Sequence, residues 1–543
     1  MQRKPAVRPS RRSFLRGAAG VAGGAIFRAP DRIRAGELSR ARAAARGRRR
    51  RLILDDDGDQ VFYINAAAGP AELLATRYGP WLDGMPIDSI AWCQMWGIAW
   101  NSALEKRYGN KELSGEIATN YWRTQIDGVP LTANIPDPTP VMVDYCRDRG
   151  IEIFGSLRMN DTHDAFGQPY GRLDYPLKRK HPEFLLGDEN DRPAGSRKLL
   201  KNWIGSGLDF AHQAVRDDRF WWIDHTASQY NLDGIDLNLF RFPWYFKPGQ
   251  EERNMPLLTK LVRRARRRLD AISSERGRPM LLGVRIPGTI DSCRKVGIDI
   301  ETWLQEDLID RMLIGGGQAC SSTPAEKLIA LGHRHGVPVY PCISCDMPHF
   351  ADPQVLRGTA AVLWQSGADG LYLWNYHYIR TRGHLRGRPH PEDYQYLDEL
   401  GDPNRLAHLD KIFVANPPEY TRENLWAYLR VSAPLPLPVT IKRVPSGIPI
   451  RIGDDIAEAE SRGRLKSVRL RLEFDQDVRA LKFDLHVNGR HVGDVRDRSD
   501  KGTRSDYALS AAWIRPGVNR LDVAVTGDGS VRLTQTSVIV RYQ

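Results

Sequence analysis

Residues 208–246 read LDFAHQAVRDDRFWWIDHTASQYNLDGIDLNLFRFPWYF. Within this stretch, residues 215–230 carry a helical pattern, and the run 234–239 alternates apolar with polar residues as a strand does. A period of two places Asp236 and Asn238 on one face of that strand, which is the inward face if the apolar side chains pack against helices. A helix that leads into such a strand is part of a βα repeat.

Short strand-like runs and longer helical runs alternate over the whole region from residue 89 to residue 374. The predicted strands are 89–94, 151–159, 207–210, 234–239, 281–286, 311–314, 337–343 and 370–374. The predicted helices between them are 141–149, 215–230, 257–275, 299–307, 325–335 and 353–366. This order matches a (β/α)8 TIM barrel, an α/β fold of about 250 residues plus loops. A doubly wound open sheet is the alternative, but no G-x-G-x-x-G opens a helix after a strand.

The pattern changes after about residue 430, beyond a proline-rich linker at 434–438. Alternating apolar and polar runs follow, and helical patterns disappear. The stretch HVNGRHV (486–492) contains an Asn-Gly turn that predicts a two-residue hairpin. Together with IRPGVNRLDVAV (514–525), it resembles the galactose-binding-like sandwiches appended to carbohydrate enzymes. We expect a barrel in residues 52–430 and an antiparallel β-sandwich in residues 431–543.

The charge of the chain is concentrated at its start. The protein has 543 residues, with 79 Lys and Arg, 66 Asp and Glu, and a net charge of +13. Residues 1–51 contain 16 Lys or Arg against two acids, so this segment carries +14 and the remaining 492 residues carry −1. A folded region that is nearly neutral lacks the basic surface that binds a phosphate backbone. The high net charge is therefore not explained by nucleic-acid binding.

The basic start has the features of an export signal. Residues 10–16 read SRRSFLR and precede a weakly apolar stretch at 17–27. This resembles a bacterial twin-arginine signal, with Arg16 where Lys is commonest. The resemblance implies a signal in residues 1–30, a basic flexible linker in residues 31–51, the twin-arginine export machinery as a partner, and a protein that folds before it reaches the periplasm or the medium. The apolar stretch is shorter than the roughly 20 residues of a membrane span, so no transmembrane anchor is expected. A basic disordered tail is the alternative.

The predicted site follows from where barrels place their chemistry, at the C-terminal ends of strands and in the loops after them. Carboxylates that converge there with Arg, Asn, His and Trp are typical of a site for a hydroxyl-rich ligand. The candidate catalytic residues are Asp236, Asp346 and Asp209. The candidate substrate-binding residues are Arg158, Asn160, Asp161, His163, His212, Asn238, Arg241, Arg285, Trp374, Asn375 and Tyr376.

Asp236 is the first candidate among the carboxylates, because an inward carboxylate in a barrel mouth is costly unless it has a partner. Asp346 follows a strand across the mouth and is the expected second member of the pair. Asp209 and Asp161 are alternatives to it, although Asp209 has a simpler explanation as a cap of the following helix.

The stretch 208–246, supported by FGSLRMND (154–161) and by the eightfold order, resembles the family-10-like group of glycoside hydrolase barrels. One strand in that group carries the pattern Asp-Gly-Ile-x-Leu-Asp-x-x-Arg. The resemblance implies a (β/α)8 fold and action on glycosidic bonds, and it aligns Asp236 within the pattern and Arg241 with its last Arg. Asn238 stands where the pattern has its second Asp. If the family needs the carboxylate of that Asp for catalysis, the resemblance implies a protein without this activity.

These observations predict an exported glycoside hydrolase that acts on a poly- or oligosaccharide without a cofactor or metal. A non-catalytic barrel that binds glycan is the main alternative and is favoured by Asn238. A polysaccharide lyase or sugar epimerase, with His163 or Tyr376 as base, is a third hypothesis. The spacing of Cys342 and Cys345 fits plain packing first, with a disulfide or part of a zinc site as alternatives.

Overall fold

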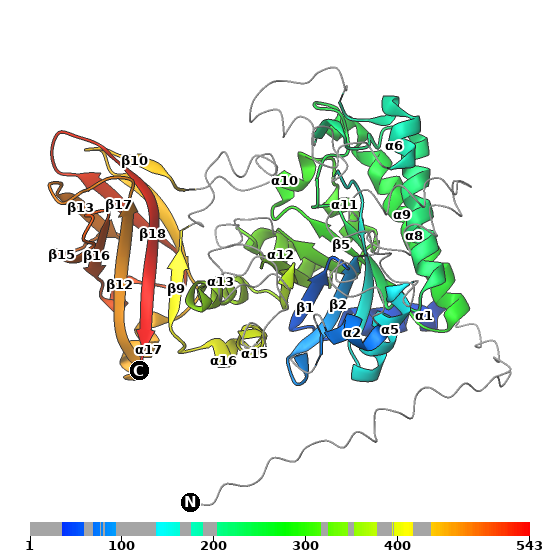
Figure 1. Cartoon of the computed structure of the whole chain (residues 1–543), viewed down its shortest axis with the longest axis horizontal. Helices are drawn as coiled ribbons and strands as arrows, with labels where there is room; N and C mark the ends of the chain where they lie inside the picture. The colour runs from blue at the N-terminus through cyan, green and yellow to red at the C-terminus, as the bar shows by residue number, and fades with distance from the viewer. Residues whose placement is uncertain are drawn as a thin grey trace, which may run out of the picture.

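The computed structural model describes residues 35–58, 69–75, 78–79, 82–93, 137–162, 175–187, 204–315, 324–345, 352–376, 394, 396–415 and 436–543. Eight parallel strands form a closed barrel in sequence order, with β1 paired to β8 (Figure 1). The strands are β1 (Leu52–Asp56), β2 (Ile87–Cys93), β3 (Glu152–Arg158), β4 (Gly234–Asn238), β5 (Leu281–Ile286), β6 (Arg311–Ile314), β7 (Val339–Ser344) and β8 (Leu371–Trp374). The predicted TIM barrel is confirmed.

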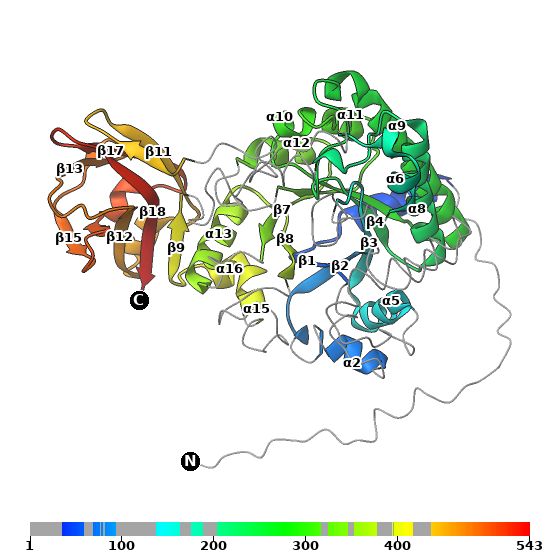
Figure 2. The ribbon, with the colours of Figure 1, turned by 45° about the horizontal axis from the view of Figure 1, so that its top comes forward.

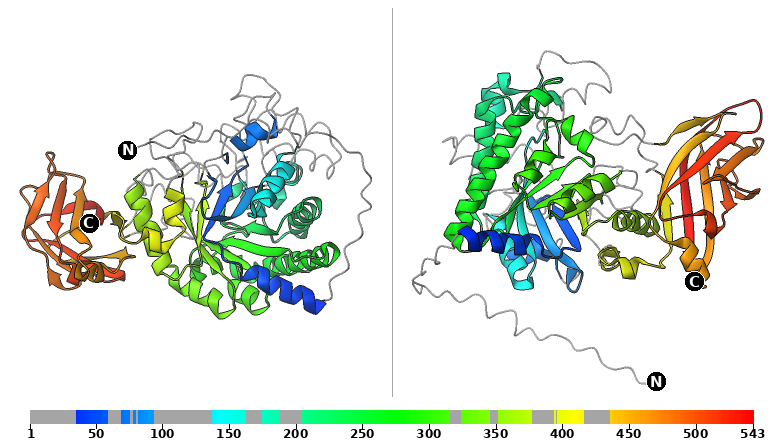
Figure 3. Two further views of the ribbon diagram at one scale, coloured as in Figure 1. Left: turned by 90° about the horizontal axis from the view of Figure 1, so that it is seen from below. Right: turned by 180° about the vertical axis from the view of Figure 1, so that it is seen from behind.

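Helices surround the barrel, as the view along its strands shows (Figure 3, left). They are α2 (Pro70–Ala75), α5 (Pro138–Arg149), α6 (Pro176–Lys180), α8 (Gln213–Gln229), α9 (Glu251–Arg276), α10 (Ile290–Arg294), α11 (Ile300–Gln305), α12 (Glu326–Arg334), α13 (Pro353–Gln365), α15 (Tyr396–Leu400) and α16 (Pro403–Leu406). The longest, α9, begins with Glu251 and Glu252 and ends at Gly277, whose positive φ of 68° suits a residue without a Cβ. Its apolar stripe packs against the sheet, which explains why a segment so rich in arginine folds as a helix.

The structure contains one barrel strand that was not predicted and lacks one that was. The sequence pattern does not predict β1, because its apolar residues 52–54 directly follow the basic segment for which we expect a linker. Residues 207–210 do not belong to the barrel, and Leu208 forms only an isolated bridge with Leu185. The total of eight was right because the missed strand and the extra strand cancel.

The segment predicted as a flexible linker contains a helix, α1 (Ala35–Arg46), which contacts α9 and β5. Arg42 and Arg46 donate to Oδ1 of the fully buried Asp310, at 2.7 and 3.0 Å. Arg50 is also fully buried and forms a two-point ion pair with Glu152 at 2.6 and 3.0 Å. Asp310 and Glu152 lie at the amino ends of β6 and β3, so the segment covers the base of the barrel, opposite its mouth (Figure 3, right).

The C-terminal part is a sandwich of two antiparallel sheets, as predicted. One sheet has the order β10 (Val439–Ile441), β18 (Val531–Tyr542), β12 (Leu465–Phe474), β16 (Arg504–Ala508), β15 (Val495–Arg498), and the other has β11 (Ser446–Ile452), β17 (Gly517–Val525), β13 (Phe483–Val487), β14 (Arg490–His491). Asn488 and Gly489 form the predicted hairpin turn, with φ of 49° and 78°, and pair Val487 with Arg490. A short helix, α17 (Ile456–Ser461), follows β11.

The two parts share a strand. β9 (Lys411–Val414) lies before the proline-rich linker but pairs with β18 of the sandwich and packs on α13 of the barrel (Figure 2). Gly358 of α13 lies so close to β9 that a Cβ there would be 2.3 Å from the carbonyl oxygen of Ile412. The sheet of the sandwich therefore takes one strand from the region assigned to the barrel by sequence. Among the described helices, none combines the length and the apolar content needed to cross a membrane.

Candidate functional site

The inside of the barrel contains both apolar and charged side chains. Inward-facing apolar side chains from five strands form a small cluster: Ile53, Ala91, Leu313, Tyr340, Cys342, Tyr372 and Trp374. Toward the mouth, the inward residues of β3, β4 and β5 are instead polar or glycine, whereas Phe154 of β3 and Leu281 of β5 lie on the same face at the base. These polar groups divide into a deep pair and a set at the mouth.

The deep pair is Asp236 with Arg311. Arg311 donates through Nε to Oδ1 of Asp236 at 2.9 Å and through Nη2 to Oδ2, and its Nη1 donates to Ser89 at 3.1 Å. Both charged residues are fully buried. A Cβ on Gly283, the neighbour of Asp236 on β5, would lie 1.9 Å from Oδ1, so glycine makes room for this pair. Asp236 faces inward as predicted, but its two carboxylate oxygens are held by an arginine below the mouth.

The mouth contains a carboxylate that the sequence analysis did not select, Asp55 near the end of β1. Its Oδ2 accepts a hydrogen bond from the hydroxyl of Tyr372 on β8, while its Oδ1 has no hydrogen-bond partner among the described residues. Burial, followed by the charge of nearby Asp57, raises the pKa of Asp55 to about 7, against the opposing effects of Arg285, Tyr372 and Arg158. Asp55 is therefore a buried carboxyl group whose charge state changes near neutral pH.

Asp57, two residues further along, has a different environment. It pairs with Arg158 at the end of β3, and Arg158 also donates to Asp161 at 3.1 Å. Burial alone would lower the pKa of Arg158, but Asp57 and the other acidic neighbours hold it well above its ordinary value. This arginine is therefore charged and forms ion pairs with the two carboxylates beside it.

Arg285 and Trp374 form an adjacent wall of the mouth. The guanidinium carbon of Arg285 lies 4.5 Å from the centre of the Trp374 ring, and that of Arg241 lies 5.1 Å from it. Arg285 also donates to the thiol of Cys342 at 3.8 Å. Burial raises the pKa of Cys342 to about 12, so this thiol is not a nucleophile at neutral pH.

The predicted asparagines lie near the mouth and hold its loops. Asn160 donates to the carbonyl of Leu208 at 3.0 Å and accepts from the nitrogen of the same residue at 2.8 Å. Asn238 accepts from the backbone nitrogen of Arg241 at 3.0 Å. Asn375 has a positive φ of 51° directly after β8, and Tyr376 is fully buried beside Tyr78. Asn160 and Asn238 thus have hydrogen-bond partners in the protein itself.

Asp209 and His212 lie together at the start of α8, in the loop that follows β3. The Asp209 carboxylate accepts from the nitrogen of Ala211 at 2.9 Å and lies 4.0 Å from Nε2 of His212. The His212 ring packs on Phe184 with a centroid distance of 4.7 Å. Asp209 accepts within the turn before α8 and does not cap that helix, whose N-cap residue is His212, so the predicted cap was wrong.

Two predicted residues, Asp346 and His163, lie outside the described residues. Cys342 and Cys345 are both free thiols and buried, so they form no disulfide with each other. Within the described ranges, no group of three or more His, Cys, Asp or Glu side chains has an arrangement that could hold a metal ion.

Asp55 and Asp57 were missed because β1 was missed. The available signal was the run Asp55-Asp56-Asp57-Gly58-Asp59 directly after the apolar residues 52–54. Acidic residues after an apolar run mark the end of a barrel strand, where catalytic groups gather.

No protein-family model matches the chain, and no curated protein sequence matches it. The solved structures that match it include three glycosidases, each with a TM-score below 0.4. An alpha-amylase from Anoxybacillus has 11% identity and a TM-score of 0.36, covering 88% of this chain and 98% of its own. The GH36 alpha-galactosidase AgaA from Geobacillus stearothermophilus has 11% identity and a TM-score of 0.36, and the match covers 93% of this chain and 57% of AgaA. Alpha-L-fucosidase isoenzyme 2 from Paenibacillus thiaminolyticus has 12% identity and a TM-score of 0.38, and the match covers 65% of this chain and 49% of the fucosidase.

Proposed function

We propose that the protein is an exported glycoside hydrolase that acts on a poly- or oligosaccharide through a carboxylate pair at the barrel mouth. The observation that carries the proposal is the buried Asp55 carboxyl, with a pKa of about 7 and one oxygen without a hydrogen-bond partner among the described residues. A carboxyl group that is still protonated near neutral pH is the acid that glycosidic bond cleavage needs.

Asp57 is the proposed second member of the pair. It pairs with Arg158, and its negative charge is one of the causes that raise the pKa of the neighbouring Asp55. Two neighbouring carboxyl groups in environments this different are the arrangement that separates an acid from a base or nucleophile. Arg285, Arg241 and Trp374 supply an aromatic face and donors against which a sugar ring fits.

This assignment replaces the pair based on Asp236. Asp236 is fully buried and neutralised by Arg311, so its proposed role is to hold β4 and β6 together inside the barrel. Asp209 is proposed to stabilise the turn before α8. Asp346 remains a candidate catalytic residue from the sequence. Residues 1–30 are the proposed twin-arginine signal, which would deliver the protein to the periplasm or the medium.

The test is hydrolysis of a polysaccharide panel by the wild-type protein and by the variants Asp55→Asn and Asp236→Asn, each compared at equal folded fraction. We expect Asp55→Asn to lose activity by about 10²–10⁴-fold. Wild-type protein that binds a glycan of the panel but hydrolyses none of it would favour the non-catalytic barrel. Equal activity of Asp55→Asn and wild type would remove Asp55 from the mechanism.

A further inference from the structure

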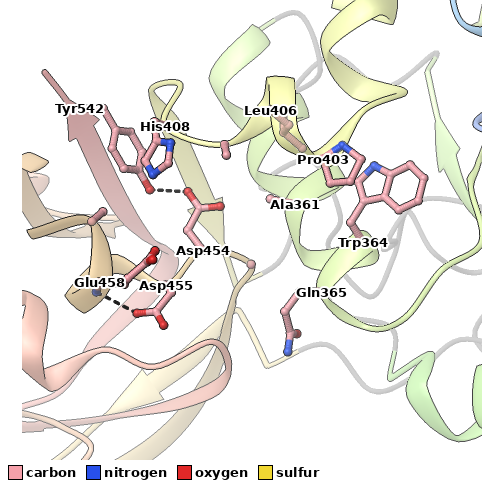
Figure 4. Close-up of a pocket in the computed structure, with 13 residues that line it drawn as sticks. Ala361, Trp364, Gln365, Pro403, Leu406, His408, Asp454, Asp455, Glu458 and Tyr542 are labelled. Carbon is pink, nitrogen blue, oxygen red and sulfur yellow. Dashed lines mark hydrogen bonds between the residues drawn. The ribbon is translucent and has the colours of Figure 1, made fainter. Parts of the chain in front are cut away.

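A pocket lies between the barrel and the sandwich, away from the mouth. It has a volume of about 350 Å³, within the range of roughly 300–1,000 Å³ that small-ligand pockets have. It is lined by α13, by α16 and the turn after it, by the turn between β11 and α17, and by the end of β18 (Figure 4). Gly401, just before α16, lies against Pro86 and Leu52 at the amino ends of β2 and β1, so this pocket is on the side of the barrel base.

The two walls of the pocket differ in chemistry. The barrel wall is mainly apolar and contains Trp364, Pro403 and Leu406, whereas the sandwich wall carries the carboxylates of Asp454, Asp455 and Glu458 (Figure 4). Carboxylate oxygens only accept hydrogen bonds when ionised, so that wall suits a ligand rich in donors. A ligand for this pocket therefore has one apolar face and donors on its other edge.

The walls are held at a fixed spacing. The Trp364 indole donates to the carbonyl of Leu400 at 2.9 Å, which fixes the ring. On the other side, Asp454 accepts from the hydroxyl of Tyr542 at 2.5 Å and from Lys411 at 2.9 Å. A Cβ on Gly453 would lie 2.3 Å from the backbone of Ala361, so only glycine allows this contact between sandwich and barrel. The pocket is therefore preformed, which lowers the entropic cost of binding.

The carboxylates of the pocket are largely neutralised. Lys411 is fully buried against Asp454, and Arg462 pairs with Glu458 at 2.7 Å. Asp455 accepts from the backbone nitrogen of Glu458 at 3.0 Å. Two of the three carboxylates therefore have a cationic partner, so the pocket attracts a cation only weakly and offers no unpaired cation to an anion. The remaining match is a neutral, hydroxyl-rich ring with an apolar CH face.

From these observations we propose that the pocket between Trp364 and the Asp455–Glu458 wall is a second saccharide-binding site, which takes neutral sugar residues of an oligo- or polysaccharide. The apolar face of the sugar stacks toward Trp364 and Pro403, and its hydroxyl groups donate to Asp455 and Glu458. This site goes beyond the proposed hydrolysis at the mouth and does not depend on it.

The test measures binding by isothermal titration calorimetry on the full chain carrying Asp55→Asn, so that no probe is consumed. The probes are maltohexaose and xylohexaose as neutral oligosaccharides, a hexamer of glucosamine as a cationic one and hexagalacturonate as an anionic one. The pocket variant is Asp455→Asn with Glu458→Gln, because Asn keeps the cap of α17 and both side chains are exposed. The matched control is Glu460→Gln, on the same helix but outside the pocket.

We expect a neutral hexasaccharide to bind and the pocket variant to weaken one binding component at least tenfold, with the control unchanged. Trp364→Ala should weaken the same component. Identical binding by the pocket variant and the control would overturn the proposal, as would no saturable binding of either neutral probe. Loss of binding to the glucosamine hexamer alone would overturn the ligand class. Since the readout is binding and every variant compared carries the same Asp55→Asn change, a failure of the hydrolase proposal leaves these results interpretable.

Discussion

The hydroxyl of Tyr372 donates a hydrogen bond to Oδ2 of Asp55, across the β1–β8 pair that closes the barrel. Burial and the neighbouring Asp55 hold the pKa of Tyr372 well above its ordinary value, so the hydroxyl keeps its proton. The contact fixes one oxygen of Asp55 as an acceptor and orients the other. Two residues 317 positions apart in the chain thus build the central group of the site together.

If Asp55 is the acid, activity depends on its proton. We expect kcat/KM of the wild-type protein to fall as the pH rises through about 7, because the carboxyl loses the proton that it must transfer. In Asp55→Asn, kcat/KM should no longer fall as the pH rises through about 7, and activity should be about 10²–10⁴-fold lower than in the wild type. The control is Asp494→Asn, an exposed aspartate of the sandwich, which should keep the wild-type profile. A profile that stays flat between pH 5 and 9, measured on a glycan that the wild type hydrolyses, would contradict the assignment.

Two neighbours should move the pKa of Asp55 in opposite directions. Tyr372→Phe removes a donor to the carboxylate and should raise this pKa, whereas Asp57→Asn removes a nearby negative charge and should lower it. Carbon NMR titration of the Asp55 carboxyl would measure both changes. Shifts of the same sign in the two variants would show that the pKa is set by burial changes and not by these two contacts.

Asp55 also couples stability to pH. Its pKa is about 7 in the folded protein and about 3.9 in an unfolded chain, so the folded state binds the extra proton between these values. The contribution of Asp55 to the free energy of unfolding therefore falls by roughly 4 kcal/mol as the pH rises from 4 to above 7. Urea unfolding of wild type and Asp55→Asn at several pH values would measure this contribution, as a difference in how steeply the free energy of unfolding changes with pH. The variant should become the more stable of the two at high pH.

The basic segment at the base should be part of the folded protein. Compared with a chain that begins at residue 35, one that begins at residue 52 leaves Glu152 without Arg50, and it leaves Asp310 with Arg266 but without Arg42 and Arg46. An uncompensated buried charge costs about 3–5 kcal/mol, so the shorter chain should be strongly destabilised. Calorimetry would measure this.

Point variants separate the ion pair from the loss of the segment. Arg50→Gln should destabilise the protein, and Arg49→Gln, at the exposed neighbouring position, should not. The same reasoning limits processing of the export signal to positions before residue 35. An exported protein whose amino terminus lies within residues 36–51 would contradict this.

The deep ion pair should be structural. Arg311→Met leaves Asp236 buried and unpaired and should cost about 3–5 kcal/mol in the free energy of unfolding. Asp236→Leu combined with Arg311→Met should recover much of that loss, since an apolar pair of similar volume often replaces a buried ion pair. A double-mutant cycle by urea unfolding would measure the coupling. Additive losses would argue against a coupled pair.

Local patterns predicted the architecture well, because they depend on neighbours in the chain. The alternation through Asp236 and Asn238 correctly gave an inward polar face, and the Asn488-Gly489 turn gave a hairpin of the sandwich. The prediction was wrong at β1 and at residues 207–210, where an apolar run is too short to tell a strand from a loop.

The sequence by itself determined a (β/α)8 barrel followed by an antiparallel sandwich, because periodicity and turn chemistry act over a few residues. Only the tertiary structure decided which carboxylates are held by arginine and which face the mouth. Asp236 meets Arg311, Asp55 meets Tyr372, and Arg46 meets Asp310, each across a gap of 75 to 317 residues. Burial and charge of a side chain depend on such distant partners, so closure of the barrel, and not the local pattern, sets the chemistry of its mouth.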